Sequence, residues 1–285
     1  MTQFPTGLSA IADDIDLVVM DLWGCMHDGI KAYPAAIEAL RGLKARNIPV
    51  ALVSNAPRRI ETVRPRLREM GIGDDLYAGF YTSGEEVWNH LAKRDAAGYD
   101  KLGRRAYQII GAQDATFTEG LDIELTHDIG SADFLLVLGV ASPEVKVEDF
   151  TDVLKAARAR DLPLVCANPD LIVHRGRIAE ICAGAIAEAY FEMDGKVLIE
   201  GKPHAGIYRR VLNDFKVPPS RLVGIGDALR TDVAGAAGIG AKSLLIGGGI
   251  HHAALLKDGK IDALALKELA RGGPSPDYSL PYLCW

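Results

Sequence analysis

The sequence alternates between short runs of apolar or β-branched residues and segments whose apolar residues recur with helical spacing. The run Leu17–Met20 is followed by a helical segment from about Pro34 to Arg46, and then by a second run at Pro49–Val53. Such alternation is typical of βαβ units, in which a helix joins two parallel strands. We therefore expect an α/β fold built on a parallel sheet.

The same pattern predicts further elements along the chain. Ser83 and Glu86 resemble a capping box for a helix over 85–93. The other expected helices cover 60–70, 143–160, 178–191, 205–215, 231–237 and 263–270, and the other expected strands cover 106–110, 134–138, 162–165, 196–199, 222–225 and 243–246.

The length of 285 residues favours two domains, since one domain typically holds about 150 residues. A polar, glycine-containing stretch between Asp95 and Arg105 is typical of a surface connection. The elements after it form a small α/β unit, and the first pattern resumes near Gly201. We expect one domain to be inserted into the other.

The composition is that of an ordinary globular protein, with 25% charged and 48% hydrophobic residues. The formal net charge of −6 does not favour binding to nucleic acid. The N-terminus lacks a signal-peptide pattern, and no apolar stretch is long enough to span a membrane. The four cysteines form no CxxC pair, which favours reduced thiols. We expect a cytoplasmic enzyme.

Polar side chains follow several of the predicted strands. Asp21, Ser54-Asn55 and Asp227 each come directly after or close to a strand end, Lys202 follows another strand, and Asp232 lies five residues beyond Asp227. In parallel sheets, reactive groups collect at the carboxyl ends of the strands. Two carboxylates suit a magnesium ion, an aspartate can accept a phosphoryl group, and a lysine offsets phosphoryl charge.

Each of these residues also has a purely structural interpretation. An aspartate at a strand end commonly forms a helix cap or a turn, and Ser54-Asn55 and Gly201-Lys202-Pro203 have the composition of ordinary turns. For each residue taken singly, the structural interpretation is the better one. Four such groups on four strand ends favour a functional site.

These residues also carry a family resemblance. The segments are Asp21-Leu22-Trp23-Gly24, Ser54-Asn55, Gly201-Lys202-Pro203 and Gly226-Asp227-Ala228-Leu229-Arg230-Thr231-Asp232. Together they resemble the four motifs of the haloacid dehalogenase-like (HAD) hydrolases. The form of the last two motifs, with Ala167-Asn168-Pro169-Asp170, is similar to subfamily IIA, the p-nitrophenyl- and pyridoxal-phosphatase-like group.

The resemblance implies a Rossmann-like HAD core with a parallel sheet, covering 1–83 and 193–285, and an inserted α/β C2-type cap covering 84–192. It implies a phosphatase that depends on Mg²⁺ and acts on a small phosphorylated metabolite, such as a sugar phosphate.

The resemblance also implies a role for each motif. Asp21 would be the nucleophile and a metal ligand, joined at the metal by Asp227 and the backbone oxygen of Trp23. Ser54, Asn55 and Lys202 would bind phosphate. Asp232 would support the metal from close range.

Trp23 departs from the family pattern. Phosphate-ester hydrolases of the family usually carry an acid/base aspartate two residues after the nucleophile, and an indole N–H cannot shuttle a proton. Loss of a positioned acid/base lowers rates by roughly 10²–10⁴-fold, so turnover should be weakened or specialised for good leaving groups. His27 is a minority candidate for a replacement, and Asp28-Gly29 beside it equally indicates a plain turn.

For several other residues the sequence gives only weak indications of contact with the substrate. Arg58, close after Ser54, could assist an anionic substrate or simply lie in an exposed helical turn. Asn168, Asp170, His174 and Arg175 follow a strand of the insert and could select substrate or merely be soluble loop residues.

Two other classes compete with the phosphatase. The first is a catalytically degenerate protein that binds a phosphorylated ligand, and Trp23 favours it. The second is a carbon–halogen hydrolase, which needs no metal, and the presence of both Asp227 and Asp232 argues against it. The resemblance also makes a homodimer plausible, and the apolar end of the chain, 278–285, could dock on the core or on a partner chain.

Overall fold

The computed structural model describes residues 1–111, 114, 116–175 and 178–285, without the side chains of His174 and Arg175. The chain divides into two compact units. The outer unit comprises Met1–Ser54, Val63–Tyr81 and Lys202–Trp285, and the inserted unit comprises Asn55–Thr62 and Thr82–Gly201. Among the described residues, no helix is both long and apolar enough to cross a membrane.

The outer unit is built on a six-stranded sheet with the order β15-β12-β11-β1-β2-β3. Its strands are β1 (Leu17–Met20), β2 (Val50–Ser54), β3 (Gly79–Thr82), β11 (Leu222–Gly226), β12 (Lys242–Ile246) and β15 (Tyr278–Leu280). Strands β2, β1, β11, β12 and β15 pair in parallel. Strands β1 and β2 are buried along their whole length, which explains why they read as continuous apolar runs.

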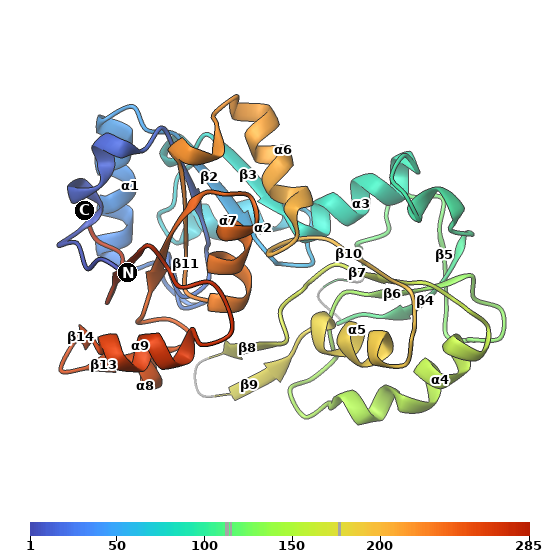
Figure 1. Cartoon of the computed structure of the whole chain (residues 1–285). Helices are drawn as coiled ribbons and strands as arrows, with labels where there is room; N and C mark the ends of the chain where they lie inside the picture. Colours follow the sequence, from blue (N-terminus) through green and yellow to red (C-terminus); the bar gives the residue numbers. More distant parts are fainter. Residues whose placement is uncertain (112–113, 115, 176–177) are drawn as a thin grey trace. The chain divides into compact units, whose positions relative to one another are not determined.

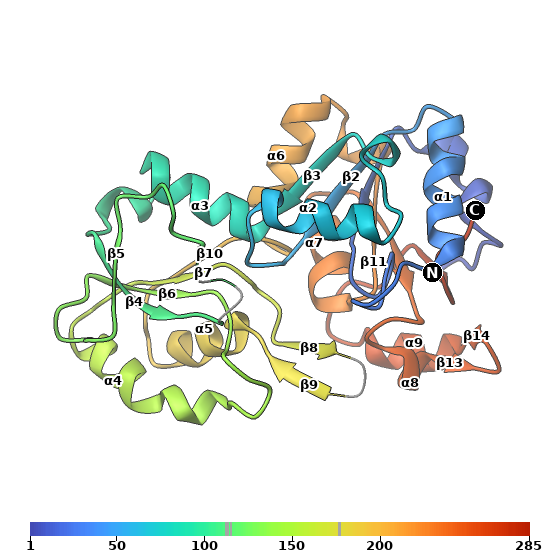
Figure 2. The ribbon, with the colours of Figure 1, turned by 180° about the vertical axis from the view of Figure 1, so that it is seen from behind.

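Helices cover both faces of this sheet. The helices of the outer unit are α1 (Pro34–Ala45), α2 (Ile60–Glu69), α6 (Ala205–Phe215), α7 (Ala234–Gly238), α8 (His252–Leu255) and α9 (Ala263–Leu269), and a small hairpin joins β13 (Leu256–Lys257) to β14 (Lys260–Ile261). Helix α7 lies in front of the sheet in Figure 1, and α2 lies in front in the reverse view of Figure 2. Alternate residues of β1 and β2 pack against Ile207 and Val211 of α6.

The inserted unit has its own five-stranded parallel sheet, with the order β10-β7-β6-β4-β5. Its elements are α3 (Ser83–Lys93), β4 (Arg105–Ile109), β5 (Glu124–Thr126), β6 (Phe134–Val137), α4 (Thr151–Ala159), β7 (Leu164–Cys166), β8 (Ile172–Arg175), β9 (Ile178–Ile181), α5 (Ala183–Glu192) and β10 (Val197–Ile199). Helices α4 and α5 cover one face of the sheet, and α3 covers the other. The expected α/β class with an inserted second unit is therefore confirmed.

Several predicted elements differ from the observed ones. The predicted helix over 178–191 is wrong in its first turn, because Ile178–Ile181 pairs with Ile172–Arg175 as an antiparallel hairpin. The α-helix expected over 143–160 begins only at Thr151, after a 3₁₀ turn over Val147–Phe150. The cap of α3 is Thr82, whose hydroxyl accepts the Glu85 N–H at 3.0 Å, and Ser83 is already helical.

The last strand of the inserted unit and the last strand of the chain each pair within their own unit. Residues 193–201 were expected in the outer unit, but β10 pairs in parallel with β7 and so belongs to the inserted sheet. The apolar C-terminal segment supplies β15, which pairs with β12 of the same chain. The two termini lie close together (Figure 1), and Leu8 N–H donates to the Cys284 carbonyl at 3.0 Å.

Candidate active site

Two aspartates are brought together by neighbouring strands. Strands β1 and β11 pair in parallel with Met20 opposite Ile225, and Asp21 N–H donates to the Ile225 carbonyl at 2.8 Å. Asp21 follows β1 directly and Asp227 follows β11 directly. Carboxylate oxygens of Asp21, Asp227 and Asp232 all lie within 4.8 Å of one another, and all three residues are buried. We call these three residues the acidic cluster.

Lys202 lies against this cluster with only 2% of its surface exposed. Its Nζ is 2.5 Å from Asp21 Oδ1 and 2.7 Å from Asp232 Oδ1. Burial alone would lower the pKa of Lys202, but the attraction of Asp21 and Asp232 outweighs burial and raises that pKa well above its usual value. The ammonium group therefore stays charged and faces the oxygens of Asp21.

Backbone N–H groups hold the other two carboxylates. Asp232 lies in a π-helical turn, Leu229–Val233, and its Oδ2 accepts the Ala228 N–H at 3.1 Å. Oδ2 of Asp227 accepts the Ile250 N–H at 2.7 Å. Burial, followed by the charges of Asp21 and Asp232, raises the pKa of Asp227 well above its usual value.

Glycines make room for Asp227. Gly24 has a φ of +74°, and a Cβ added there would lie 1.9 Å from Asp227 Oδ2. A Cβ added at Gly249 would lie 2.1 Å from the same oxygen. The loop Gly247–Ile250 was not among the expected site residues, although its run of three glycines directly after β12 was a usable signal.

The acidic cluster suits a hard divalent cation. Three carboxylates face one ammonium group, so the four residues carry an excess of negative charge when all are ionised. Magnesium prefers oxygen ligands and is commonly held by one or two carboxylates with water and substrate phosphate. The donor set of Asp21 and Asp227 fits that preference.

Ser54 ends strand β2 and Asn55 follows it; β2 is the neighbour of β1 on the side away from β11. Ser54 belongs to the outer unit and is 8% exposed. Asn55 begins the inserted unit, and its Nδ2 donates to Asp170 Oδ1 at 2.9 Å. The structure thus shows Asn55 bound to another side chain of the inserted unit, a contact that the sequence did not predict.

Trp23 and His27 belong to one tightly folded loop. Gly24 N–H donates to the His27 carbonyl at 2.9 Å, and the two rings meet edge to face with centroids 5.4 Å apart. A Cβ at Gly29 would lie 2.4 Å from Trp23 Cη2, so the indole packs closely on that glycine.

His27 is buried in this loop, and its Nδ1 accepts the Gly29 N–H at 3.0 Å. Burial lowers the pKa of His27 to about 4, with a smaller raising effect from Asp28. The ring is therefore neutral near pH 7, with its proton on Nε2. A neutral, buried ring is poorly suited to the acid/base role that was considered for His27.

The remaining candidates lie in the inserted unit. Nε of Arg58 donates to Asp114 Oδ1 at 3.0 Å, and Asp114 is almost fully buried, which favours a structural role for Arg58. Asp170 N–H donates to Asn168 Oδ1 at 3.0 Å. The side chains of His174 and Arg175 lie outside the described part of the chain.

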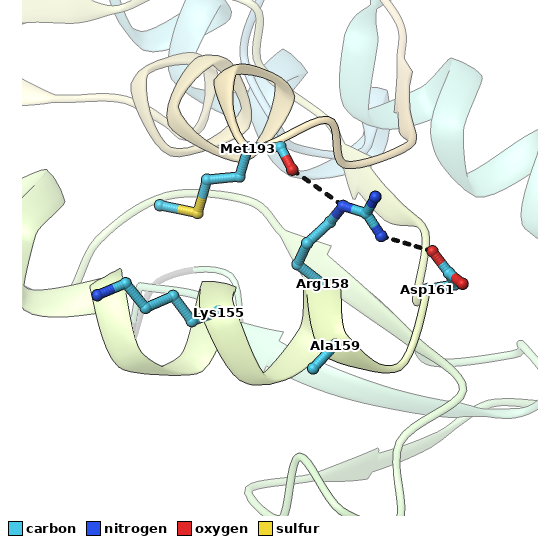
Figure 3. Close-up of a pocket in the computed structure, with 5 residues that line it drawn as sticks. All are labelled: Lys155, Arg158, Ala159, Asp161 and Met193. Carbon is cyan, nitrogen blue, oxygen red and sulfur yellow. Dashed lines mark hydrogen bonds and ion pairs between the residues drawn. The ribbon is translucent and has the colours of Figure 1, made fainter.

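A surface pocket of about 550 Å³ also lies in the inserted unit, between α4 and the end of α5 (Figure 3). Arg158 there donates to the Met193 carbonyl at 2.9 Å and pairs with Asp161 at 2.6 Å. Lys155 and Ala159 complete its lining. These five residues hold no cluster of carboxylates, so the acidic cluster remains the candidate active site.

Comparison with known proteins agrees with this geometry. Residues 18–124 match the family model of haloacid dehalogenase-like hydrolases, and residues 199–270 match a HAD-hydrolase-like model. A solved haloacid dehalogenase-like hydrolase from Brucella suis 1330 is 33% identical to this chain, with a TM-score of 0.82, and the match covers 98% of this chain and 100% of that one. The chain belongs to the haloacid dehalogenase-like hydrolase family.

More distant relatives of this HAD hydrolase carry phosphatase names. The ribonucleotide monophosphatase NagD of Escherichia coli K12 is 27% identical, over 82% of this chain and 88% of that protein. The p-nitrophenyl phosphatase of Archaeoglobus fulgidus shares the fold at 22% identity, with a TM-score of 0.69 and coverage of 94% and 97%. The expected membership in the family and its subfamily IIA is confirmed, as is the assignment of the chain as a hydrolase.

Proposed function

We propose that this HAD hydrolase is a Mg²⁺-dependent phosphatase of small phosphorylated metabolites that acts through an aspartyl-phosphate at Asp21. The observation that carries the proposal is the convergence of Asp21 and Asp227 beside Lys202, whose Nζ lies 2.5 Å from Asp21. The names of relatives support the substrate class, because they include a ribonucleotide monophosphatase and a human glycerol-3-phosphate phosphatase.

The reaction would proceed in two displacements. An oxygen of Asp21 attacks the phosphorus, the ester P–O bond breaks, and its electron pair leaves with the ester oxygen, which takes a proton from solvent to become the alcohol. Water then attacks the phosphorus of the aspartyl-phosphate, the P–O bond to Asp21 breaks, and phosphate leaves as the proton of the attacking water passes to solvent.

Each neighbouring residue has a proposed part. Lys202 offsets charge on the phosphoryl oxygens, and Asp232 fixes the lysine at 2.7 Å. Ser54, with Asn55 beside it, would orient the phosphoryl group. Asp21, Asp227 and the backbone oxygen of Trp23 would hold Mg²⁺, which when bound neutralises charge developing on the transferring phosphoryl group.

The division of labour between the two units is also a proposal. The outer unit, which holds the acidic cluster, would be the catalytic core. The inserted unit would be the C2-type cap that selects the substrate, as the resemblance to subfamily IIA implies.

Trp23 shapes the expected activity. An indole supplies no proton to the leaving oxygen, so turnover should be slow for alkyl phosphates and faster for aryl phosphates. The same residue favours a second candidate function, a phosphate-binding protein without useful turnover. Magnesium-dependent binding of inorganic phosphate with no hydrolysis of any ester would support that second function.

The test is a steady-state assay with alkyl and aryl phosphates, with and without Mg²⁺, on the wild type and on Asp21→Asn. The proposal predicts magnesium-dependent release of phosphate that the substitution abolishes. Release that continues unchanged in Asp21→Asn would refute the aspartyl-phosphate mechanism.

A further inference from the structure

Asn55 and Asp170 are 115 positions apart and form one hydrogen bond inside the inserted unit. The donor is Asn55 Nδ2 and the acceptor is Asp170 Oδ1, at 2.9 Å. An ionised carboxylate can only accept hydrogen bonds, so this contact fixes which end of the Asn55 amide faces Asp170. Hydrogen bonds to an ionised acceptor are among the stronger ones in proteins.

Hydrogen bonds and close packing fix the backbone of the loop that carries Asp170. Its N–H donates to Asn168 Oδ1 at 3.0 Å, and the Asn168 carbonyl accepts from the Cys166 thiol at 3.3 Å. A Cβ added at Gly184, in the first turn of α5, would lie 2.5 Å from the Asp170 carbonyl oxygen. Helix α5 therefore packs closely on this loop, and the Asp170 carboxylate is presented from a fixed backbone.

The other end of the Asn55 amide faces Gly201. A Cβ added at Gly201, whose φ is +110°, would lie 2.7 Å from Asn55 Oδ1. Asn55 directly follows Ser54, and Gly201 directly precedes Lys202. The Asn55 side chain thus projects from the segment that carries Ser54 and contacts the segment that carries Lys202. Asn55 is only 4% exposed, so its amide depends on protein groups rather than on bulk water for hydrogen bonds.

We propose that Asp170 is a positioning residue, which orients the Asn55 amide and thereby fixes the backbone segments that carry Ser54 and Lys202. The proposal rests on the proposed function of those two residues as phosphate-binding groups. Without Asp170, the Asn55 amide loses a charged acceptor, and the backbone segments that carry Ser54 and Lys202 are held less firmly. The expected consequence is weaker phosphate binding rather than a lost chemical step.

Two variants of Asp170 test this role. Asp170→Ala removes the acceptor, whereas Asp170→Asn keeps an acceptor oxygen and removes the charge. Asp152→Asn, an exposed carboxylate in the first turn of α4, is the matched control.

The measurements are inorganic phosphate binding by calorimetry in the presence of Mg²⁺, and KM and kcat for p-nitrophenyl phosphate. Asp170→Ala should weaken phosphate binding and raise KM by about tenfold or more, with a smaller change in kcat. Asp170→Asn should stay within about threefold of the wild type, because its oxygen can still accept from Asn55.

Two results would overturn the inference. Wild-type phosphate affinity in Asp170→Ala would show that phosphate binding does not depend on the contact between Asp170 and Asn55. Loss of kcat without loss of binding in Asp170→Asn would show that the carboxylate acts in the chemistry. Phosphate binding is measured without turnover. An inactive wild type would therefore count against the proposed phosphatase while the binding comparison still decides the role of Asp170.

Discussion

Substitution of Gly24 by alanine should damage the metal site more than it damages the fold. The backbone of Gly24 has a φ of +74°, a conformation that costs a non-glycine residue about 1–2 kcal/mol. The new Cβ would also lie 1.9 Å from Asp227 Oδ2, about 1.5 Å short of the 3.4 Å at which ordinary contact begins. The Asp227 carboxylate must therefore move.

The chain offers a matched control in Gly240. Its φ is +75°, and a Cβ added there meets nothing within 4 Å. Gly240→Ala therefore carries the same backbone strain without the collision with Asp227. The difference between the two variants measures the displacement of Asp227 alone.

The assay is magnesium activation of p-nitrophenyl phosphate hydrolysis, with urea denaturation of each variant. Gly240→Ala should lose about 1–2 kcal/mol of unfolding free energy, and Gly24→Ala should lose more, because the Asp227 carboxylate must also move. Protein metal sites tolerate ligand displacements of only about 0.2 Å, so Gly24→Ala should raise the half-saturating magnesium concentration by about 10–100-fold. Gly240→Ala should leave that concentration unchanged. Equal magnesium dependence in the two variants would refute the assignment of Asp227 as a ligand.

Three further substitutions test other parts of the account. Trp23→Asp supplies a carboxyl group and should raise alkyl phosphate turnover by about 10²–10⁴-fold, with little gain for p-nitrophenyl phosphate; equal gains for both esters would contradict this explanation. His27 has a folded pKa of about 4 against 6.5 when free, so the unfolded state binds its proton more readily and the fold should lose about 2 kcal/mol between pH 7 and pH 5. Urea denaturation at both pH values should show this loss reduced in His27→Asn, whose Oδ1 can accept the Gly29 N–H, and an unchanged loss would refute it. Lys202→Met should lower the unfolding free energy by about 3–5 kcal/mol, because Asp21 and Asp232 lose a buried counter-charge; an unchanged urea midpoint would show that these pairs contribute nothing.

The strand ends explain why much of the acidic cluster could be predicted. Asp21 and Asp227 follow apolar runs, and the carboxyl ends of parallel neighbours share one edge of a sheet. The ion pair between Lys202 and Asp232 was not predicted, because it depends on the π-helical turn that carries Asp232. Local residue patterns do not distinguish such a turn from the start of an α-helix.

Contacts between segments that are distant in the chain could not be predicted from local residue patterns either. Asn55 was expected to bind phosphate, and nothing near it in the chain indicates Asp170 as its partner. Strand β9 was mistaken for helix because its apolar residues run directly into α5 with no glycine or proline between them. Only the pairing with β8 fixes Ile178–Ile181 as a strand.

The central claim is that Asp21 and Asp227 hold one divalent cation beside Lys202. The most direct measurement is a crystal of the wild type soaked in Mn²⁺, which accepts the same oxygen ligands as Mg²⁺ and scatters anomalously. The account predicts one anomalous peak within about 2.0–2.2 Å of an oxygen of each aspartate. A peak elsewhere, or no peak at saturating Mn²⁺, would contradict it.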